Sequence, residues 1–129
     1  MDSGAIRRRL TLGLGVLTAS LVLACAVPGT AQAAPSTCSG RQVRTLWFAT
    51  GSVHVYKRDG YVCAVTRARV PGAKRPMSVT VQARGNRPVT DQGWFGRLAG
   101  PVTVHAGHRC VRVGGSVGGT SVKSGWILC

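Results

Sequence analysis

Acidic residues are almost absent from this sequence. Its 129 residues include only three acids, Asp2, Asp59 and Asp91, and no glutamate. Hydrolysis by a carboxylate pair needs two acids whose pKa values are held apart, and Asp59 belongs to an Asp-Gly turn motif. The G-x-S-x-G nucleophile motif is also missing. The sequence therefore argues against glycosidase, aspartic-protease and serine-hydrolase chemistry.

Long apolar runs are equally scarce, because the only one covers residues 10–26. Three arginines precede it at residues 7–9, Pro28 and Gly29 interrupt the chain after it, and the small-x-small sequence Ala-Gln-Ala follows at residues 31–33. This order is typical of a secretory signal peptide. We therefore predict a helical signal peptide at residues 1–33, and no second run long enough to span a bilayer follows it.

Cleavage is expected between Ala33 and Ala34, although two other readings of the export segment remain open. Residues 22–25 loosely resemble a lipoprotein box, which would place a lipid on Cys25. The arginines at residues 7–9 are also compatible with twin-arginine export. We favour the Ala-Gln-Ala site and the general secretory route, because Leu23 fits a lipoprotein box poorly and the hydrophobic run is long.

The region after the signal, residues 34–129, has 96 residues and fits one small domain. A core of this size is marginal, and an exported chain can add disulfides. Four cysteines remain, and they allow three pairings. We favour pairs that would tether each chain end to a nearby strand. Without a C-x-x-C pair, metal ligation by thiolates is the weaker alternative, and no metal or cofactor is predicted. The favoured pairs are Cys38–Cys63 and Cys110–Cys129.

Helical periodicity is missing from residues 34–129, whereas short alternating segments recur there. Residues 52–70 alternate around the turn dipeptide Asp59-Gly60 and predict a β-hairpin, with Val53 and Val55 on one face and His54 and Tyr56 on the other. The fold class expected is all-β, a small antiparallel sandwich or barrel of six to seven short strands with two disulfides. Any helix should fall within residues 5–27. Further strands are expected at residues 41–48, 77–83, 101–105 and 110–113, and residues 92–99 are ambiguous between strand and loop. Residues 114–119 are expected to be a glycine-rich connector, and residues 122–129 close the domain.

Positive charge dominates what is present. The whole chain carries +14, and removing Arg7, Arg8, Arg9 and Asp2 with the signal leaves +12. Such a field concentrates anions near the surface, so we expect an anionic cell-wall or spore-surface polymer as the partner. Specific recognition of a polyanion and non-specific adhesion both remain open. The candidate polyanion contacts are Arg67, Arg69, Lys74, Arg75, Arg84 and Arg87.

Aromatic residues make up 5% of the chain and include three tryptophans. An exposed tryptophan can stack on bases or sugars, but a small core is short of large side chains. We therefore expect at least two of Trp47, Trp94 and Trp126 to be structural. No RNA-binding sheet motif or helix-turn-helix accompanies them, so no specific nucleic acid is predicted as a partner.

Histidines supply the remaining candidates for chemistry. His54, His105 and Lys57 could serve acid–base cleavage of RNA if neighbouring strands brought them together. His105 and His108 lie three residues apart, but Cys110 is unavailable as a third metal ligand once it is disulfide-bonded. The glycines of residues 114–119 lack the Gly-Lys-Ser/Thr ending of a phosphate-binding loop. A small secreted ribonuclease is therefore the third-ranked function, and no catalytic residue is assigned.

Several stretches resemble the spore-associated protein family of small secreted actinomycete proteins. The similarity spans nearly the whole of residues 34–129, and the cysteine spacing and the Ala-Gly-Pro-Val segment at residues 99–102 are its most specific parts. It implies a protein at the surface of aerial hyphae and spores, with no activity, cofactor or catalytic residues to carry over. This chain differs in being strongly basic at residues 67–87. The matching stretches are residues 38–40, 60–66, 77–79, 99–104 and 110–111, and the glycine-rich run to Cys129.

Together these observations predict a secreted, non-enzymatic protein of the spore or cell envelope, held by electrostatic contact with anionic wall polymers. The alternative is a free extracellular polyanion-binding or antimicrobial protein. Self-association is left open by the sequence.

Overall fold

The computed structural model describes residues 37–129. The predicted signal peptide, the Ala33–Ala34 cleavage site and Cys25 lie outside the described residues. The described chain is all-β, as expected, with eight strands where the sequence predicted six or seven. They are β1 (Arg41–Phe48), β2 (Gly51–Arg58), β3 (Tyr61–Ala68), β4 (Arg75–Ala83), β5 (Val89–Phe95), β6 (Leu98–His105), β7 (Val111–Val117) and β8 (Thr120–Lys123).

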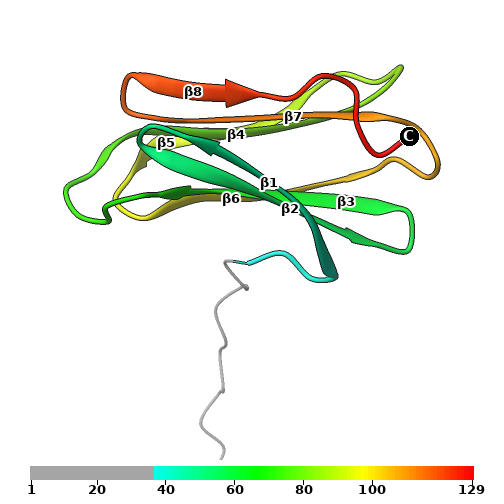
Figure 1. The fold of residues 1–129 in the computed structure, drawn as a ribbon, viewed down its shortest axis with the longest axis horizontal. Helices are drawn as coiled ribbons and strands as arrows, with labels where there is room; N and C mark the ends of the chain where they lie inside the picture. The colour runs from blue at the N-terminus through cyan, green and yellow to red at the C-terminus, as the bar shows by residue number, and fades with distance from the viewer. Residues whose placement is uncertain (1–36) are drawn as a thin grey trace, which may run out of the picture. The chain divides into compact units, whose positions relative to one another are not determined.

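The strands form two four-stranded antiparallel sheets, which makes the fold a sandwich (Figure 1). Sheet A has the order β1-β2-β3-β6, and sheet B has the order β5-β4-β7-β8. The chain passes from sheet B to sheet A between β5 and β6, where the amide of Ala68 donates to the carbonyl of Arg97 at 2.9 Å. On the other side, β1 contacts β8.

The core lies between the sheets and consists mostly of valine. Alternation along each strand sends every second side chain inward, and β-branched side chains suit a pleated surface. Sheet A contributes Val53, Val55, Val62 and Ala64. Sheet B contributes Met77, Val79, Val81, Val111, Val113 and Val117, and all ten of these side chains are buried.

The predicted β-hairpin is confirmed as β2 and β3. Asp59 and Gly60 connect the strands with φ values of 50° and 81°, and two consecutive positive φ angles give the type I′ turn that matches strand twist. Val53 pairs with Thr66 and Val55 with Ala64, on the core face. His54 and Tyr56 therefore lie on the outer face, as the alternation indicated.

Residues 114–119 are not a connector, contrary to the sequence-based expectation. Residues 114–117 complete β7, and only Gly118 and Gly119 form the turn to β8. Glycine is needed at 115 because the sheets approach closely there: a Cβ would collide with Oγ1 of Thr66 and lie 2.6 Å from Cγ2 of Val53. The glycines therefore permit close packing of the sandwich.

Residues 122–129, which the sequence placed at the close of the domain, do not form one strand. The last strand ends at Lys123, and the segment beyond it pairs only through the bridge between Val111 and Ile127. Their backbones exchange two hydrogen bonds of 2.8 Å. Ile127 and Leu128 of this segment are partly buried and pack against the core.

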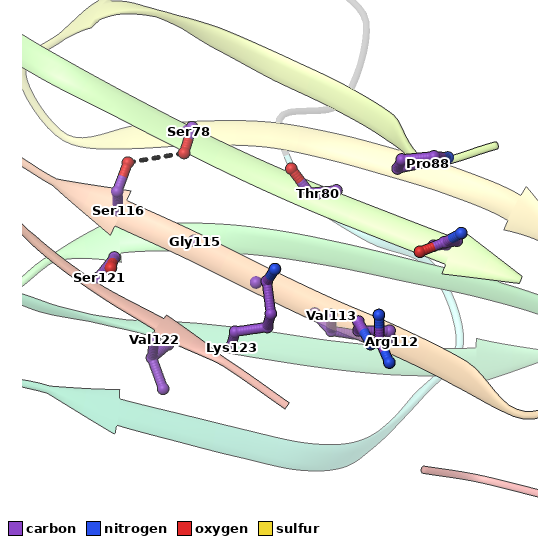
Figure 2. A pocket seen from close by; sticks show the side chains of 12 residues that line it. Ser78, Thr80, Pro88, Arg112, Val113, Gly115, Ser116, Ser121, Val122 and Lys123 are labelled. Atoms are coloured by element: carbon purple, nitrogen blue, oxygen red, sulfur yellow. Dashed lines mark hydrogen bonds between the residues drawn. The ribbon is translucent and has the colours of Figure 1, made fainter. Parts of the chain in front are cut away.

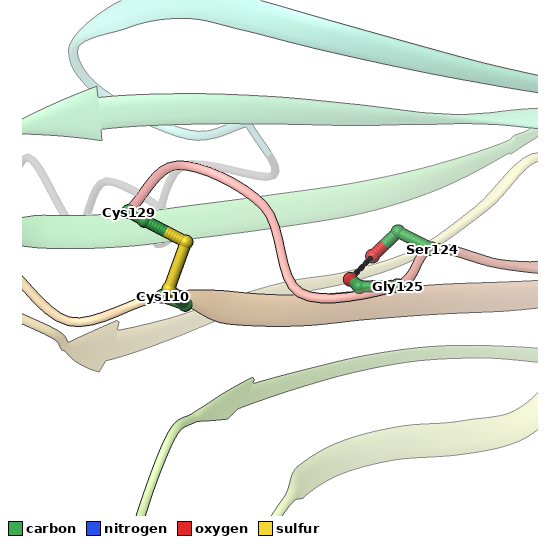
Figure 3. Close-up of a disulfide and its surroundings, with 4 residues drawn as sticks. All are labelled: Cys110, Ser124, Gly125 and Cys129. Atoms are coloured by element: carbon green, nitrogen blue, oxygen red, sulfur yellow. Dashed lines mark hydrogen bonds between the residues drawn. A yellow bond between two sulfur atoms is a disulfide. The ribbon is translucent and has the colours of Figure 1, made fainter.

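Both favoured disulfides are present. Cys38 is bonded to Cys63 of β3, which ties the start of the described chain to sheet A. Cys110 is bonded to Cys129, and the C-terminal segment curls back to the start of β7 to reach it (Figure 3). Within residues 37–129, no helix is long and apolar enough to cross a membrane.

Candidate anion-binding surface

The six predicted polyanion contacts form two separate groups. Arg67 and Arg69 lie at the end of β3 and just beyond it, and Lys74 and Arg75 lie at the start of β4; we call these four the Arg67 group. Arg84 and Arg87 follow the opposite end of β4. Because β4 has nine residues, the two sets are about 27 Å apart. The structure therefore does not unite all six residues in one patch.

The Arg67 group contains both available and engaged cations. Arg67 and Lys74 are exposed. Nη1 of Arg69 donates to the carbonyl of Ala49 at 3.5 Å. Arg75 is half-buried, and its Nη2 donates to the carbonyl of Val70. Arg75 therefore stabilises the β3–β4 loop, and Arg67 and Lys74 are the members best placed to meet an anion.

Trp47 lies beside this group and is 75% exposed, although at least two of the three tryptophans were expected to be structural. Trp47 pairs with Ser52, and Ser52 pairs with Arg67, so the three residues form one row across β1, β2 and β3. A shallow cavity of about 210 Å³ between Trp47 and Arg69 adjoins that row. An indole and two guanidinium groups are thus available at one end of sheet A.

His54 lies next to this row and is held as a neutral imidazole. The amide nitrogen of Gln42 is 3.1 Å from Nδ1, and Oγ of Ser52 is 2.9 Å from Nε2. Because an amide nitrogen can only donate, Nδ1 accepts, and Nε2 donates to Ser52. Burial, followed by the nearby positive charge of Arg67, lowers the pKa of His54. Both effects disfavour the imidazolium.

The three residues considered for RNA cleavage do not converge. His54 of β2 pairs with Val65 of β3, whereas His105 of β6 pairs with Tyr61, which lies four residues before Val65 in β3. Strand geometry separates the two histidines by roughly 16 Å. Lys57 occupies the opposite face of β2 from His54. The geometry required by the ribonuclease hypothesis is therefore missing from these residues.

The second basic group is larger than the sequence indicated, and we define the Arg84 group as Arg84, Arg87, Arg109 and Arg112. The guanidinium carbon of Arg112 lies 4.3 Å from the ring centre of Trp126, and that of Arg84 lies 5.7 Å away. These distances fit cation–π contacts. Arg112 stands between Val111 and Val113, which both face inward. This alternation of apolar and charged residues is the sequence signal that could have placed Arg112 on the surface.

Arg109 has a structural role within the Arg84 group. It donates from Nε to the carbonyl of Ala106 at 3.1 Å, from Nη1 to that of Arg84 at 3.2 Å and from Nη2 to that of His105 at 2.9 Å. These bonds join the β6–β7 turn to the end of β4. Arg109 therefore fixes the position of Arg84.

The two acids of this part of the chain neutralise little of the charge. Asp59 lies 3.7 Å from Arg58 in an exposed ion pair. Oδ2 of Asp91 accepts a hydrogen bond of 2.8 Å from the amide of Gly100, which links β5 to β6. No group of three or more potential metal-ligating side chains occurs between residues 37 and 129. The arrangement is suited to holding anions through exposed cations and indole rings.

Comparison with known protein families, curated proteins and solved structures found no match for this chain.

Proposed function

We propose that this is a secreted, non-enzymatic protein that attaches to an anionic polymer of the spore or cell envelope by electrostatic contact. One observation carries the proposal. Residues 37–129 contain 14 Lys and Arg residues but only two acidic residues, and one ion pair, between Arg58 and Asp59, forms in this part of the chain. Cations left unpaired at the surface attract polyanions, and that attraction weakens as salt screens it.

The extracellular setting rests on the export signal in the sequence and on the two disulfides, which persist in oxidising compartments. The resemblance to the spore-associated protein family is the reason for naming the spore envelope. Among the basic residues, the Arg67 group is the proposed main contact, because Arg67 and Lys74 are exposed beside Trp47.

Fractionation of a producing culture tests the attachment. Medium, vegetative walls and washed spores would be probed with an antibody, and spores would be extracted first with high salt and then with detergent. We expect release by salt, since exposed charge contacts are screened. Protein found only in the medium would contradict the proposal and favour the free polyanion-binding or antimicrobial alternative.

A charge-matched pair of variants tests the assignment to the Arg67 group. Arg67→Glu/Arg69→Glu should be released at clearly lower salt than the unmodified protein. Arg41→Glu/Arg44→Glu makes the same change in net charge at two exposed positions of β1 outside this group and should have the smaller effect. Equal shifts for both variants would mean adhesion by net charge alone, and the assignment to the Arg67 group would fail.

A further inference from the structure

The outer face of sheet B carries an ordered array of hydroxyl groups. Strand register aligns Gln92, Ser78, Ser116 and Ser121 in one row across β5, β4, β7 and β8. Oγ of Ser78 and Oγ of Ser116 are 2.6 Å apart. In the next row, Oγ1 of Thr80 and Oγ1 of Thr90 are 2.8 Å apart. Hydroxyls on neighbouring strands are therefore held in fixed positions.

This face is hollowed along its length. Gly114 lies between Thr80 and Lys123 in the second row and has no side chain to fill the space. A cavity of about 300 Å³ lies there, and it is lined by Ser78, Thr80, Ser116 and Lys123 among others (Figure 2). A second hollow of about 310 Å³ shares Ser78 and Ser116 with the first. The two hollows together form one shallow groove.

An exposed indole lies at one end of the groove. Trp94 on the edge strand β5 is 67% exposed and lines the second hollow with Gln92. From the row of Trp94 to the row of Arg112 the groove covers the seven residues of β4 from Pro76 to Gln82, or about 20 Å. That length suits several linked rings rather than a single small molecule.

Positive charge lines the rest of the groove. Lys123 extends from β8 over β7 (Figure 2), and Arg112 lies at the far end, stacked on Trp126 at 4.3 Å. Neither acid of the described chain is on this face, because Asp59 belongs to the β2–β3 turn and Asp91 is bonded to Gly100. Negative charge on a ligand would therefore complement this face.

We propose that this groove binds a segment of an acidic polysaccharide. Trp94 stacks on the apolar face of a sugar ring, the serine and threonine hydroxyls exchange hydrogen bonds with ring hydroxyls, and Lys123 and Arg112 contact the carboxylate or phosphate groups. A single-stranded nucleic acid fits less well, because successive bases need a series of stacking platforms and the only tryptophan exposed in the groove is Trp94. The inference rests on the proposed function and specifies its polymer.

The proposal can be tested by measuring binding to polymers that carry sugar rings, negative charge or both. The full chain, expressed in a secretion host, would be titrated with polygalacturonate, with its methyl ester, with inorganic polyphosphate and with single-stranded DNA at one salt concentration. Polygalacturonate offers rings and charge, the ester offers rings alone, and polyphosphate offers charge alone. We expect tightest binding to polygalacturonate and clearly weaker binding to the ester.

Two matched pairs of variants locate the site. Trp94→Ala should weaken polygalacturonate binding about tenfold and leave polyphosphate binding unchanged, whereas Tyr61→Ala removes an exposed aromatic ring from β3, outside the groove and the Arg67 group, and should change neither. Lys123→Gln should weaken polygalacturonate binding and make it less dependent on salt, with a smaller effect from Arg44→Gln, which removes one positive charge from β1. The four replaced side chains are exposed, so these variants should fold normally.

Several outcomes would contradict the proposal that the groove is a binding site. The groove would be excluded by an unchanged affinity of Trp94→Ala for polygalacturonate or by an equal loss of affinity in Tyr61→Ala. Equal binding of polygalacturonate and its methyl ester would also exclude it. DNA bound as tightly as polygalacturonate, with the same dependence on Trp94, would assign the face to nucleic acid. If polyanions bind and only Arg67→Glu/Arg69→Glu weakens them, the groove fails while the proposed function stands. Binding to no polyanion would reject both.

Discussion

Gly115 of β7 faces Thr66 of β3 across the sandwich with no room for a side-chain carbon between them. Thr66 is fully buried, and its Oγ1 has no hydrogen-bond partner. A buried hydroxyl without a partner normally destabilises a fold. The two sheets nevertheless approach each other closely where this polar atom lies.

Replacing Gly115 by alanine should therefore destabilise the domain. The new Cβ would meet Oγ1 of Thr66 and lie 2.6 Å from Cγ2 of Val53, and overpacking of this kind costs about 1–3 kcal/mol. Urea unfolding followed by tryptophan fluorescence would measure the loss. Gly119→Ala in the β7–β8 turn is the control, because a Cβ there has no neighbour within 4 Å. Equal stability of the two variants would contradict the close-packing account.

The contact between Gly115 and Thr66 should also appear as energetic coupling. Thr66→Ala removes the Oγ1 atom that the new Cβ would meet, so Gly115→Ala should cost less in that background. The coupling expected is about 1 kcal/mol, since residues in contact couple by roughly 0.5–3 kcal/mol. A double-mutant cycle by urea unfolding gives the value, and strict additivity would show that the clash is relieved elsewhere. Some loss should remain, because Val53 still lies close.

The Cys110–Cys129 disulfide should hold the C-terminal segment in place. It closes a loop with a sequence separation of 19, which is worth about 3 kcal/mol in the chain-entropy model. In Cys110→Ala/Cys129→Ala we expect that loss of stability together with faster hydrogen exchange at the amide of Ile127, which donates to Val111. The amides of the β2–β3 hairpin should lose protection only through the global change. Unchanged exchange at Ile127 would mean that the bridge holds without the disulfide.

Stability should rise with pH through the titration range of His54. Its pKa is lowered from 6.5 by burial and by Arg67, so between the folded and unfolded pKa values the unfolded chain binds more protons. The contribution is therefore fully present above pH 6.5 and is lost as pH falls toward the folded pKa. Urea midpoints between about pH 5 and 7.5 would show this slope, and His54→Gln should flatten it. The same slope in that variant would assign it to another group.

Local patterns predicted the parts of the fold whose signals are local. The β2–β3 hairpin follows from the alternation of Val53 and Val55 and from the turn preference of Asp59-Gly60. The strand at residues 41–48 matches β1, and Met77–Ala83 forms most of β4. The need for glycine at position 115 had no such local signal. It arises because Val53 and Thr66 leave no space for a side chain, and these residues are about 50 or more residues earlier in the sequence.

The surface was harder to predict than the strands. Grouping basic residues by sequence proximity joined Arg75 to Arg84, although β4 carries them to opposite ends of the sandwich. At least two of the three tryptophans were expected to be structural, yet Trp47 and Trp94 are exposed, because the valines of the two sheets already fill the interior. The hydroxyl rows of sheet B depend on the register of four strands, which no single segment encodes.

The separation of the Arg67 and Arg84 groups has a consequence for the proposed contact with a charged polymer. About 27 Å is more than three Debye lengths at physiological ionic strength, where one Debye length is about 8 Å. The fields of the two groups are therefore screened from each other. Under the proposed function, we expect a short anionic chain to contact one group, and a long polymer, or two neighbouring chains, to contact both and gain avidity. The two ends of the sandwich would then act as two separate sites of one bivalent protein.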